Sequence, residues 1–286
     1  MTSDQTPASH ATAPEGTFSP ARPAWLGSLG NVRNVVRQEM IARQLERHLP
    51  PAGAWVLDVG AGQGTQSIRL ARAGHRVHAV EPDADMRAAF DAALSGESAE
   101  VQARVTLQEG RIGELAAVIG DRVYDVVLVL GVLMYLPASE PVISELAPRV
   151  ASGGLLALAI RTNTSAVWRP VARQDWQGAL AAFDEYDAAQ RERRGMRYVN
   201  EIGTPARADD LANLTSYAST LGLGLENWYG VRIAVDPEEV DPEPPRDPRE
   251  LAALLDVEER LGASDPFRQL GQLAHLILRR GAGPDR

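Results

Sequence analysis

Short apolar runs alternate with segments of helical periodicity through the first half of the chain. The runs are almost continuous in Val, Leu and Ile, which is typical of strands buried on both faces. They span 54–59, 76–81, 104–109, 124–131 and 154–160. Helices are predicted between them, starting at Thr65 and Ala84, briefly after 109 and near 138–150. Five strand–helix units in this order predict an α/β fold with a parallel sheet that helices cover on both sides.

The pattern changes on either side of these units. Before them, residues 31–49 carry apolar side chains at helical spacing and predict an N-terminal helix. After Arg161, the amphipathic segment Thr164 to Asn200 predicts a helical insertion over the carboxyl edge of the sheet, with a basic cluster at Arg191, Arg193, Arg194 and Arg197. The core is predicted to resume with a helix near 207–222, a strand around 228–235, an acidic connector at 237–250, a helix near 249–262 and a strand near 273–280.

These boundaries divide the chain into four parts: a disordered tail (1–23), a cofactor-binding core (24–163), a helical insertion or lid (164–206) and the C-terminal part of the core sheet (207–286). The tail lacks the basic and apolar parts of a signal peptide. The longest apolar run, 126–137, is too short to cross a bilayer as a helix. We therefore expect a soluble, cytoplasmic protein without a membrane partner.

The amino-acid composition excludes several classes of binding and catalytic site. The 29 basic residues against 38 acidic ones give a net charge of −9, which disfavours binding of nucleic acid through bulk positive charge. Every basic residue is an arginine, so Schiff-base and P-loop lysines are excluded. Cysteine is absent, and the five histidines show no HxH or HxxxH spacing. We therefore expect no disulfide, no thiolate nucleophile and no metal site.

A glycine-rich turn follows the first predicted strand in the segment VLDVGAGQG. Asp58 lies at the end of the strand, and Gly60, Gly62 and Gly64 lie in the turn that opens the next helix. Glycine permits the unusual backbone angles of such a turn and lets a ligand approach the main chain closely. Glu81 ends the second strand, where a carboxylate can accept hydrogen bonds from both hydroxyls of a ribose. This spacing predicts a site for an adenosine-type ligand.

The GxGxG turn, with an acid two residues before its first glycine, resembles motif I of the class I S-adenosylmethionine-dependent methyltransferases. The resemblance implies their Rossmann-like fold, a doubly wound, seven-stranded, mostly parallel sheet with a helical insertion over the active site. It also implies S-adenosyl-L-methionine as cofactor. The positions that it assigns to the methionine end and ribose of the cofactor are Asp58, Gly60, Ala61, Gly62 and Glu81.

Two further segments match this family less specifically. Gly110 and Arg111 follow the third strand, where the family holds the adenine, although the family usually has an acid at the position of Arg111. Recognition of adenine would therefore depend on backbone amides. Leu130 ends the fourth strand, at a position where family members contact the cofactor.

The outer segments, within residues 27–280, resemble the smtA-like family of bacterial tRNA 5-carboxymethoxyuridine carboxyl methyltransferases. This resemblance implies that Arg33 pairs with the carboxylate of the cofactor, since a guanidinium binds a carboxylate through two hydrogen bonds. It also implies that Arg232 orients a carboxylate of the substrate. An internal salt bridge of Arg232 and a solvated Arg33 remain alternatives.

The expected reaction is methylation of a carboxylate, as on the wobble carboxymethoxyuridine of tRNA. A carboxylate is already ionised at neutral pH and needs no general base. Tyr135, just past the fourth strand, is placed to contact the acceptor. The alternatives are a small-molecule O- or carboxyl methyltransferase and, in another class, a cofactor-binding module without turnover. The methyl acceptor is thus a tRNA or a small molecule, and the sequence leaves the oligomeric state open.

Overall fold

The computed structural model describes residues 27, 30–200, 203–235 and 243–281, so the predicted tail and residues 237–242 of the acidic connector lie outside the described residues. Seven strands form the central sheet, in the order β3-β2-β1-β4-β5-β9-β8. They are β1 (Trp55–Val59), β2 (Arg76–Val80), β3 (Val105–Gln108), β4 (Tyr124–Leu130), β5 (Val150–Ile160), β8 (Leu223–Val231) and β9 (Leu273–Arg280). Only β9 runs antiparallel to its neighbours in this sheet. The predicted seven-stranded, mostly parallel fold is confirmed.

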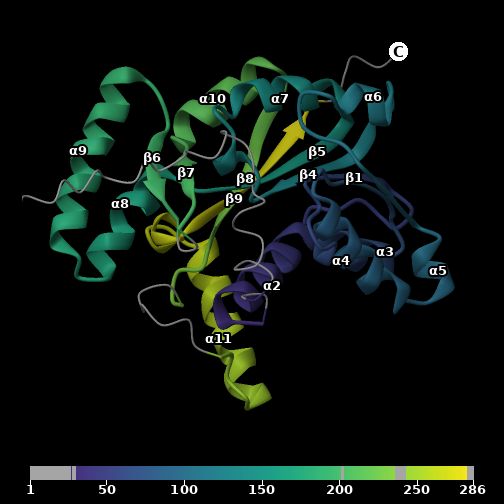
Figure 1. The fold of residues 1–286 in the computed structure, drawn as a ribbon, viewed down its shortest axis with the longest axis horizontal. Coiled ribbons are helices and arrows are strands. Elements are labelled where there is room, and N and C mark those ends of the chain that lie inside the picture. The colour runs from purple at the N-terminus through teal and green to yellow at the C-terminus, as the bar shows by residue number, and fades with distance from the viewer. Residues whose placement is uncertain (1–26, 28–29, 201–202, 236–242, 282–286) are drawn as a thin grey trace, which may run out of the picture.

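Helices cover both faces of the sheet because successive strand residues point to opposite sides. Leu57 and Val127 pack into one core with α6 (Leu115–Ile119), α7 (Glu140–Leu146) and α10 (Leu211–Thr220). Val56 and Val126 pack into the opposite core with α2 (Val32–Glu46), α3 (Thr65–Arg72), α4 (Ala84–Ser95) and α5 (Ala99–Gln102). Figure 1 shows the two layers on either side of the strands, with α11 (Pro248–Ala263) beside α2.

The chain changes direction across the sheet between β1 and β4. From β1 it proceeds outward to β2 and β3, and it then returns to pair β4 with the other edge of β1. Open α/β sheets bind ligands at such a switch point, beyond the carboxyl ends of the strands. The glycine turn after β1 lies at this position, as does the short helix η2 (Leu133–Tyr135) that follows β4.

The segment predicted as a helical insertion is only partly helical. It begins with α8 (Asn163–Ala172) and α9 (Trp176–Glu192), and then forms a hairpin of β6 (Met196–Val199) and β7 (Pro205–Ala208). The prediction that Thr164 to Asn200 is helical throughout is therefore wrong beyond Glu192. Arg193 adopts a left-handed conformation that ends α9. At Gly195 the chain passes so close to the backbone oxygen of Ala208 that a Cβ would not fit, and β6 begins with the next residue.

The C-terminal boundaries also shift. The predicted strand 228–235 begins at Leu223 and ends at Val231, and the predicted helix near 207–222 starts only at Leu211, after β7. The final strand has the predicted bounds. Within the part of the chain that the structure describes, no helix is both long and apolar enough to span a membrane.

Candidate active site

A cavity of about 600 Å³ opens at the carboxyl ends of β1, β2 and β4. This volume lies within the usual range of small-molecule sites. Every residue that the sequence analysis assigned to a site lines it: Arg33, Asp58, Gly60, Ala61, Gly62, Glu81, Gly110, Arg111, Leu130, Tyr135 and Arg232. Residues from six separated segments are thus brought together in one place.

Main-chain N–H groups of the glycine turn donate hydrogen bonds to the end of β2 and to the side chain of Glu81, which follows it. Gly60 N donates to Val80 O at 2.8 Å, and Gly62 N donates to Glu81 Oε2 at 2.8 Å. Gly60 and Gly62 both have positive φ, at 71° and 59°. A Cβ on Gly60 would lie 2.5 Å from Val132 Cγ2, so the turn leaves no room for a side chain. The exposed backbone of this turn forms one wall of the cavity.

Two buried carboxylates lie beside the turn. Asp58 Oδ2 accepts a hydrogen bond from Ser67 Oγ at 2.6 Å, and Glu81 Oε1 accepts one from Asp83 N at 3.0 Å. Burial raises the pKa of Asp58 to about 6, and the nearby charge of Glu81 adds to the rise. The hydrogen bond from Ser67 lowers this pKa, but by less than burial raises it. Burial likewise raises the pKa of Glu81, although backbone hydrogen bonds oppose the shift. Paired carboxylates of raised pKa are suited to a ligand that brings positive charge or hydroxyl donors.

The helix α2 forms the opposite wall with two arginines. Arg33 and Arg37 are buried and one helical turn apart, and Arg37 Nη2 donates to Leu130 O at 3.2 Å. Sequence reasoning found Arg33 and missed Arg37. The signal was present, because residues four apart on a helix share a face.

A second group of polar residues lies where β5 and β8 end. Arg161 and Arg232 line the cavity with exposed fractions of only 2% and 7%. Both contact Gln272, at the entry to β9: Arg161 Nη1 donates to its Oε1, and the carbonyl of Arg232 accepts from its backbone N at 3.2 Å. Arg232 has a positive φ of 64°, a conformation that costs energy for any residue except glycine.

The insertion reaches this second group through its hairpin. Arg161 Nε donates to Tyr198 Oη at 3.2 Å, and its guanidinium lies 5.3 Å from the centre of the Tyr198 ring. Asn200, another cavity residue, donates from Nδ2 to Tyr135 Oη at 3.2 Å. Sequence reasoning missed Arg161 and Asn200, although the position of Arg161 directly after an apolar strand placed it at the ligand-binding edge.

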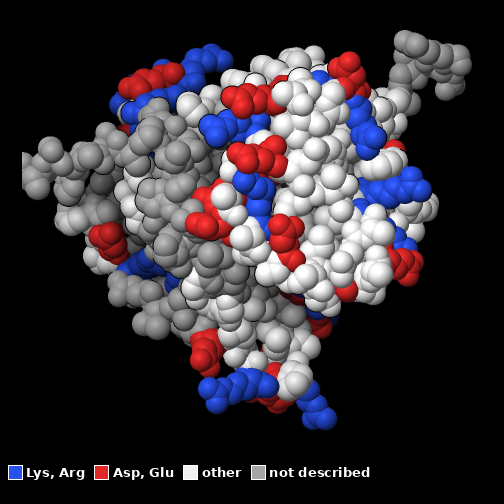
Figure 2. Space-filling model, turned by 45° about the vertical axis from the view of Figure 1, so that its right-hand side comes forward, with Lys and Arg blue, Asp and Glu red and all other residues white. Residues whose placement is uncertain are grey.

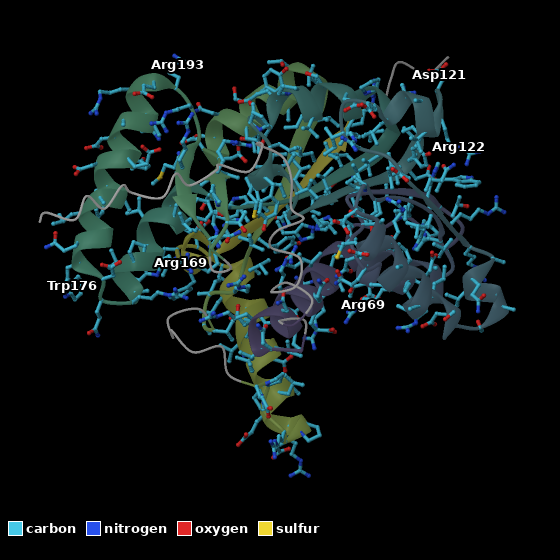
Figure 3. All side chains as sticks on the ribbon, viewed as in Figure 1. Arg69, Asp121, Arg122, Arg169, Trp176 and Arg193 are labelled. Carbon is cyan, nitrogen blue, oxygen red and sulfur yellow. The ribbon has the colours of Figure 1, made fainter. Side chains whose placement is uncertain are left out.

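The basic cluster of the insertion does not form a continuous basic face. Arg194 is paired with Glu185 and with Glu192, and Arg197 lies on β6 instead of a helix. Arg193 lies at the far end of α9 (Figure 3). On the face shown in Figure 2, arginines and acids are likewise intermixed and not separated by sign.

Comparison with known proteins identifies the kind of domain in which this cavity lies. Residues 57–156 match the family model of a methyltransferase domain. This range includes β2, β3 and β4 and parts of β1 and β5. The ubiquinone biosynthesis O-methyltransferase of Xanthomonas axonopodis pv. citri (strain 306) is 29% identical over 200 residues, which cover 69% of this chain and 72% of that protein. These matches show a methyltransferase domain, and the chain is an S-adenosylmethionine-dependent methyltransferase.

Solved structures share the fold of this methyltransferase. The magnesium protoporphyrin IX methyltransferase of Synechocystis PCC 6803, solved with bound S-adenosylhomocysteine, has a TM-score of 0.58 at 15% identity, with 92% of this chain and 95% of that one covered. The 1,6-didemethyltoxoflavin-N1-methyltransferase of Burkholderia thailandensis has a TM-score of 0.53 at 16% identity, over 94% and 91% of the two chains. At these identities the likeness concerns the fold.

The cofactor fits the residues of the cavity. S-adenosylmethionine carries an ammonium, a sulfonium and two ribose hydroxyls, and the methyltransferase presents two buried carboxylates beside a turn that a Cβ would obstruct. Asp58 and the glycine turn would hold the methionine end, and Glu81 the ribose. The cofactor supplies an electrophilic methyl group, and the protein supplies alignment and exclusion of water.

Cofactor binding by this methyltransferase is expected to weaken in acid. Because the pKa of Asp58 is raised to about 6, the carboxyl is mostly protonated at pH 5 and ionised above pH 7. A cationic ligand favours the ionised form, so Kd should rise about tenfold between pH 7 and pH 5, with a proton released on binding near pH 6. Calorimetry in two buffers of different ionisation enthalpy measures both quantities. An Asp58→Asn variant should show weak binding without this pH dependence; retention of the dependence would contradict the assignment.

Proposed function

We propose that the methyltransferase transfers its methyl group to a carboxylate oxygen of a small, negatively charged acceptor. The observation that carries this proposal is the pair of buried arginines, Arg161 and Arg232, on either side of Gln272 at the end of the cavity away from Glu81. Buried guanidiniums favour a planar, anionic oxygen group through two parallel hydrogen bonds.

The remaining cavity residues support an acceptor that needs no deprotonation. Among the described residues that line the cavity there is no histidine, and the chain contains no lysine. His78 instead contacts Tyr124 Oη at 2.8 Å within the sheet, and burial lowers its pKa. The carboxylates Asp58 and Glu81 are assigned to the cofactor. An acceptor that is already ionised removes the need for a general base, so alignment of the two reactants supplies most of the rate enhancement.

The dimensions and charge of the site favour a small acceptor over tRNA. The cavity has a volume of about 600 Å³, which suits a small acceptor beside the cofactor. Arg194 of the insertion cluster is paired with Glu185 and Glu192, and the net charge of the chain is −9. The O-methyltransferase of Xanthomonas gives further support, since it too is named for methylation of oxygen.

The proposal is tested with methyl-tritiated S-adenosylmethionine, a deproteinised metabolite extract of the host and, separately, bulk tRNA. We expect label in the small-molecule fraction that mild alkali releases as volatile methanol, because methyl esters are hydrolysed under conditions that leave ethers intact. Alkali-stable label would indicate a hydroxyl or nitrogen acceptor, and label precipitating with RNA would support the tRNA function; either result contradicts the proposal.

Removal of one of the paired arginines should affect the acceptor and not the cofactor. For Arg232→Gln we expect kcat/KM for the acceptor to fall about thirtyfold, since one charged hydrogen-bonding group contributes roughly 2 kcal/mol. Cofactor Kd should stay within threefold, as measured by calorimetry. Arg197→Gln, an exposed arginine of the insertion, is the matched control and should behave as wild type. Equal losses in acceptor and cofactor affinity would show that Arg232 only supports the fold.

A further inference from the structure

The outer surface of the insertion carries large apolar side chains that are largely exposed to solvent. Trp176 and Leu180 are each 61% exposed, Phe183 is 52% exposed, and Trp168 on α8 is 39% exposed. We call these four residues the insertion patch. Residues at i, i+4 and i+7 lie on one face of a helix, so the three members on α9 form a continuous stripe.

The insertion has its own core on the other side of α9. Ala189 and Tyr186 of this helix pack with Ala166 and Val167 of α8 and with Met196 of β6. Figure 3 shows α9 along the outer edge of the molecule, from Trp176 to Arg193, away from the sheet. The face of α9 that packs within the described fold is thus already covered by α8 and β6. The insertion patch is a second apolar face that points outward.

We propose that the insertion patch joins two copies of this chain, through an antiparallel pairing of α9 with α9 about a two-fold axis at Leu180. The apolar area of the insertion patch supports a second copy of the chain as its partner. Aromatic side chains can bury roughly 150–250 Å² each, so the insertion patch offers roughly 400 Å² per copy. Two facing patches would remove roughly 800 Å² from water before their polar rim is counted. This is below the roughly 1,200–2,000 Å² of stable specific interfaces and within the range of weak, transient ones, so the dimer should be weak and reversible.

The order of residues along α9 is self-complementary about Leu180. An antiparallel pair places Trp176 of one copy beside Phe183 of the other, and the two-fold axis repeats this contact. The stripe continues to the acid Asp187, while Arg173 lies in the turn that precedes α9. In the same pairing, Arg173 of one copy lies beside Asp187 of the other. The half-buried Arg173 and the exposed Asp187 then lie together at each end of the apolar centre, and the exposed Asp184 lies at its edge, beside Trp176 of the other copy.

Sedimentation velocity over a wide range of protein concentration tests the association. We expect a reversible dimer for the wild type, and a dissociation constant at least about thirtyfold weaker for Leu180→Glu/Phe183→Glu, the loss typical of central apolar contacts. Val257→Glu is the matched control, because Val257 is an exposed apolar residue on the helix α11. A wild type that stays monomeric, including one that binds lipid vesicles as a monomer, would overturn the proposal. So would a dimer that persists in the double variant.

Crosslinking tests the position of the axis independently of stability. The chain has no cysteine, so Leu180→Cys introduces a single thiol. At the axis, two copies of this thiol come within disulfide range, and mild oxidation should give a covalent dimer in most of the protein. Ala181→Cys lies about 100° around the helix and should stay largely monomeric. Equal crosslinking of the two variants would show random collision and contradict the proposed pairing.

Discussion

Substitution of Glu81 by alanine is expected to weaken cofactor binding by about 300-fold, or roughly 3.5 kcal/mol. Glu81 is buried, and its two oxygens accept hydrogen bonds from Gly62 N and Asp83 N. The variant would lose the charged acceptor that we assign to the ribose, and it also loses the bond that holds the glycine turn against β2. Calorimetry with S-adenosylmethionine or S-adenosylhomocysteine measures the change in Kd.

The Glu81 result can be separated from unfolding. Burial raises the pKa of this carboxyl, so its charge does not stabilise the fold. Loss of its hydrogen bonds from Gly62 N and Asp83 N should lower the free energy of unfolding by roughly 1–3 kcal/mol, which leaves Glu81→Ala folded at 25 °C, where Kd is measured. Glu81→Gln keeps one oxygen acceptor and should lose only about tenfold in affinity. Glu100→Ala removes an exposed carboxylate paired with Arg104 and serves as the control without effect. Wild-type affinity in Glu81→Ala would exclude Glu81 from the cofactor site.

The parts of the fold that sequence could predict are those in which local pattern and burial agree. β1, β4 and β9 are continuous apolar runs buried on both faces, so their bounds follow closely from the sequence. β8 begins with alternating polarity and is exposed over its first half, as an edge strand can be, which is why its start at Leu223 was missed. β6 and β7 have four residues each and depend on pairing with one another, a contact that no local pattern encodes.

The same distinction applies to the site. Asp58, Gly60, Gly62 and Glu81 have fixed spacing within one strand–turn–helix–strand unit, so sequence alone brings them together. Arg161 joins the cavity through contacts with Tyr198 and Gln272, which lie 37 and 111 positions away along the chain. An arginine after a strand could equally be solvated, and only the packing of the insertion hairpin and β9 against it decides otherwise.

Substitution of Gly60 by alanine should reduce cofactor affinity by about a hundredfold and also destabilise the fold. The residue has a φ of 71°, which costs an L-amino acid roughly 1–2 kcal/mol, and the new methyl group would lie 2.5 Å from Val132 Cγ2. Because Gly60 and Val132 both line the cavity, the methyl group and the displaced valine would occupy space needed by the cofactor. Calorimetry gives the affinity, and denaturant titration gives the free energy of unfolding.

A double variant and a second glycine separate these two effects. In Gly60→Ala/Val132→Ala the steric overlap is relieved, so part of the lost stability should return while the affinity stays low, since the methyl group still faces the cavity. Gly53→Ala has the same backbone penalty, with a φ of 96°, but nothing lies within 4 Å of its Cβ, and it is outside the cavity. It should lose roughly 1–2 kcal/mol of stability and bind the cofactor normally. If Gly60→Ala behaves like Gly53→Ala, the turn is needed for folding alone, and the cofactor must bind elsewhere.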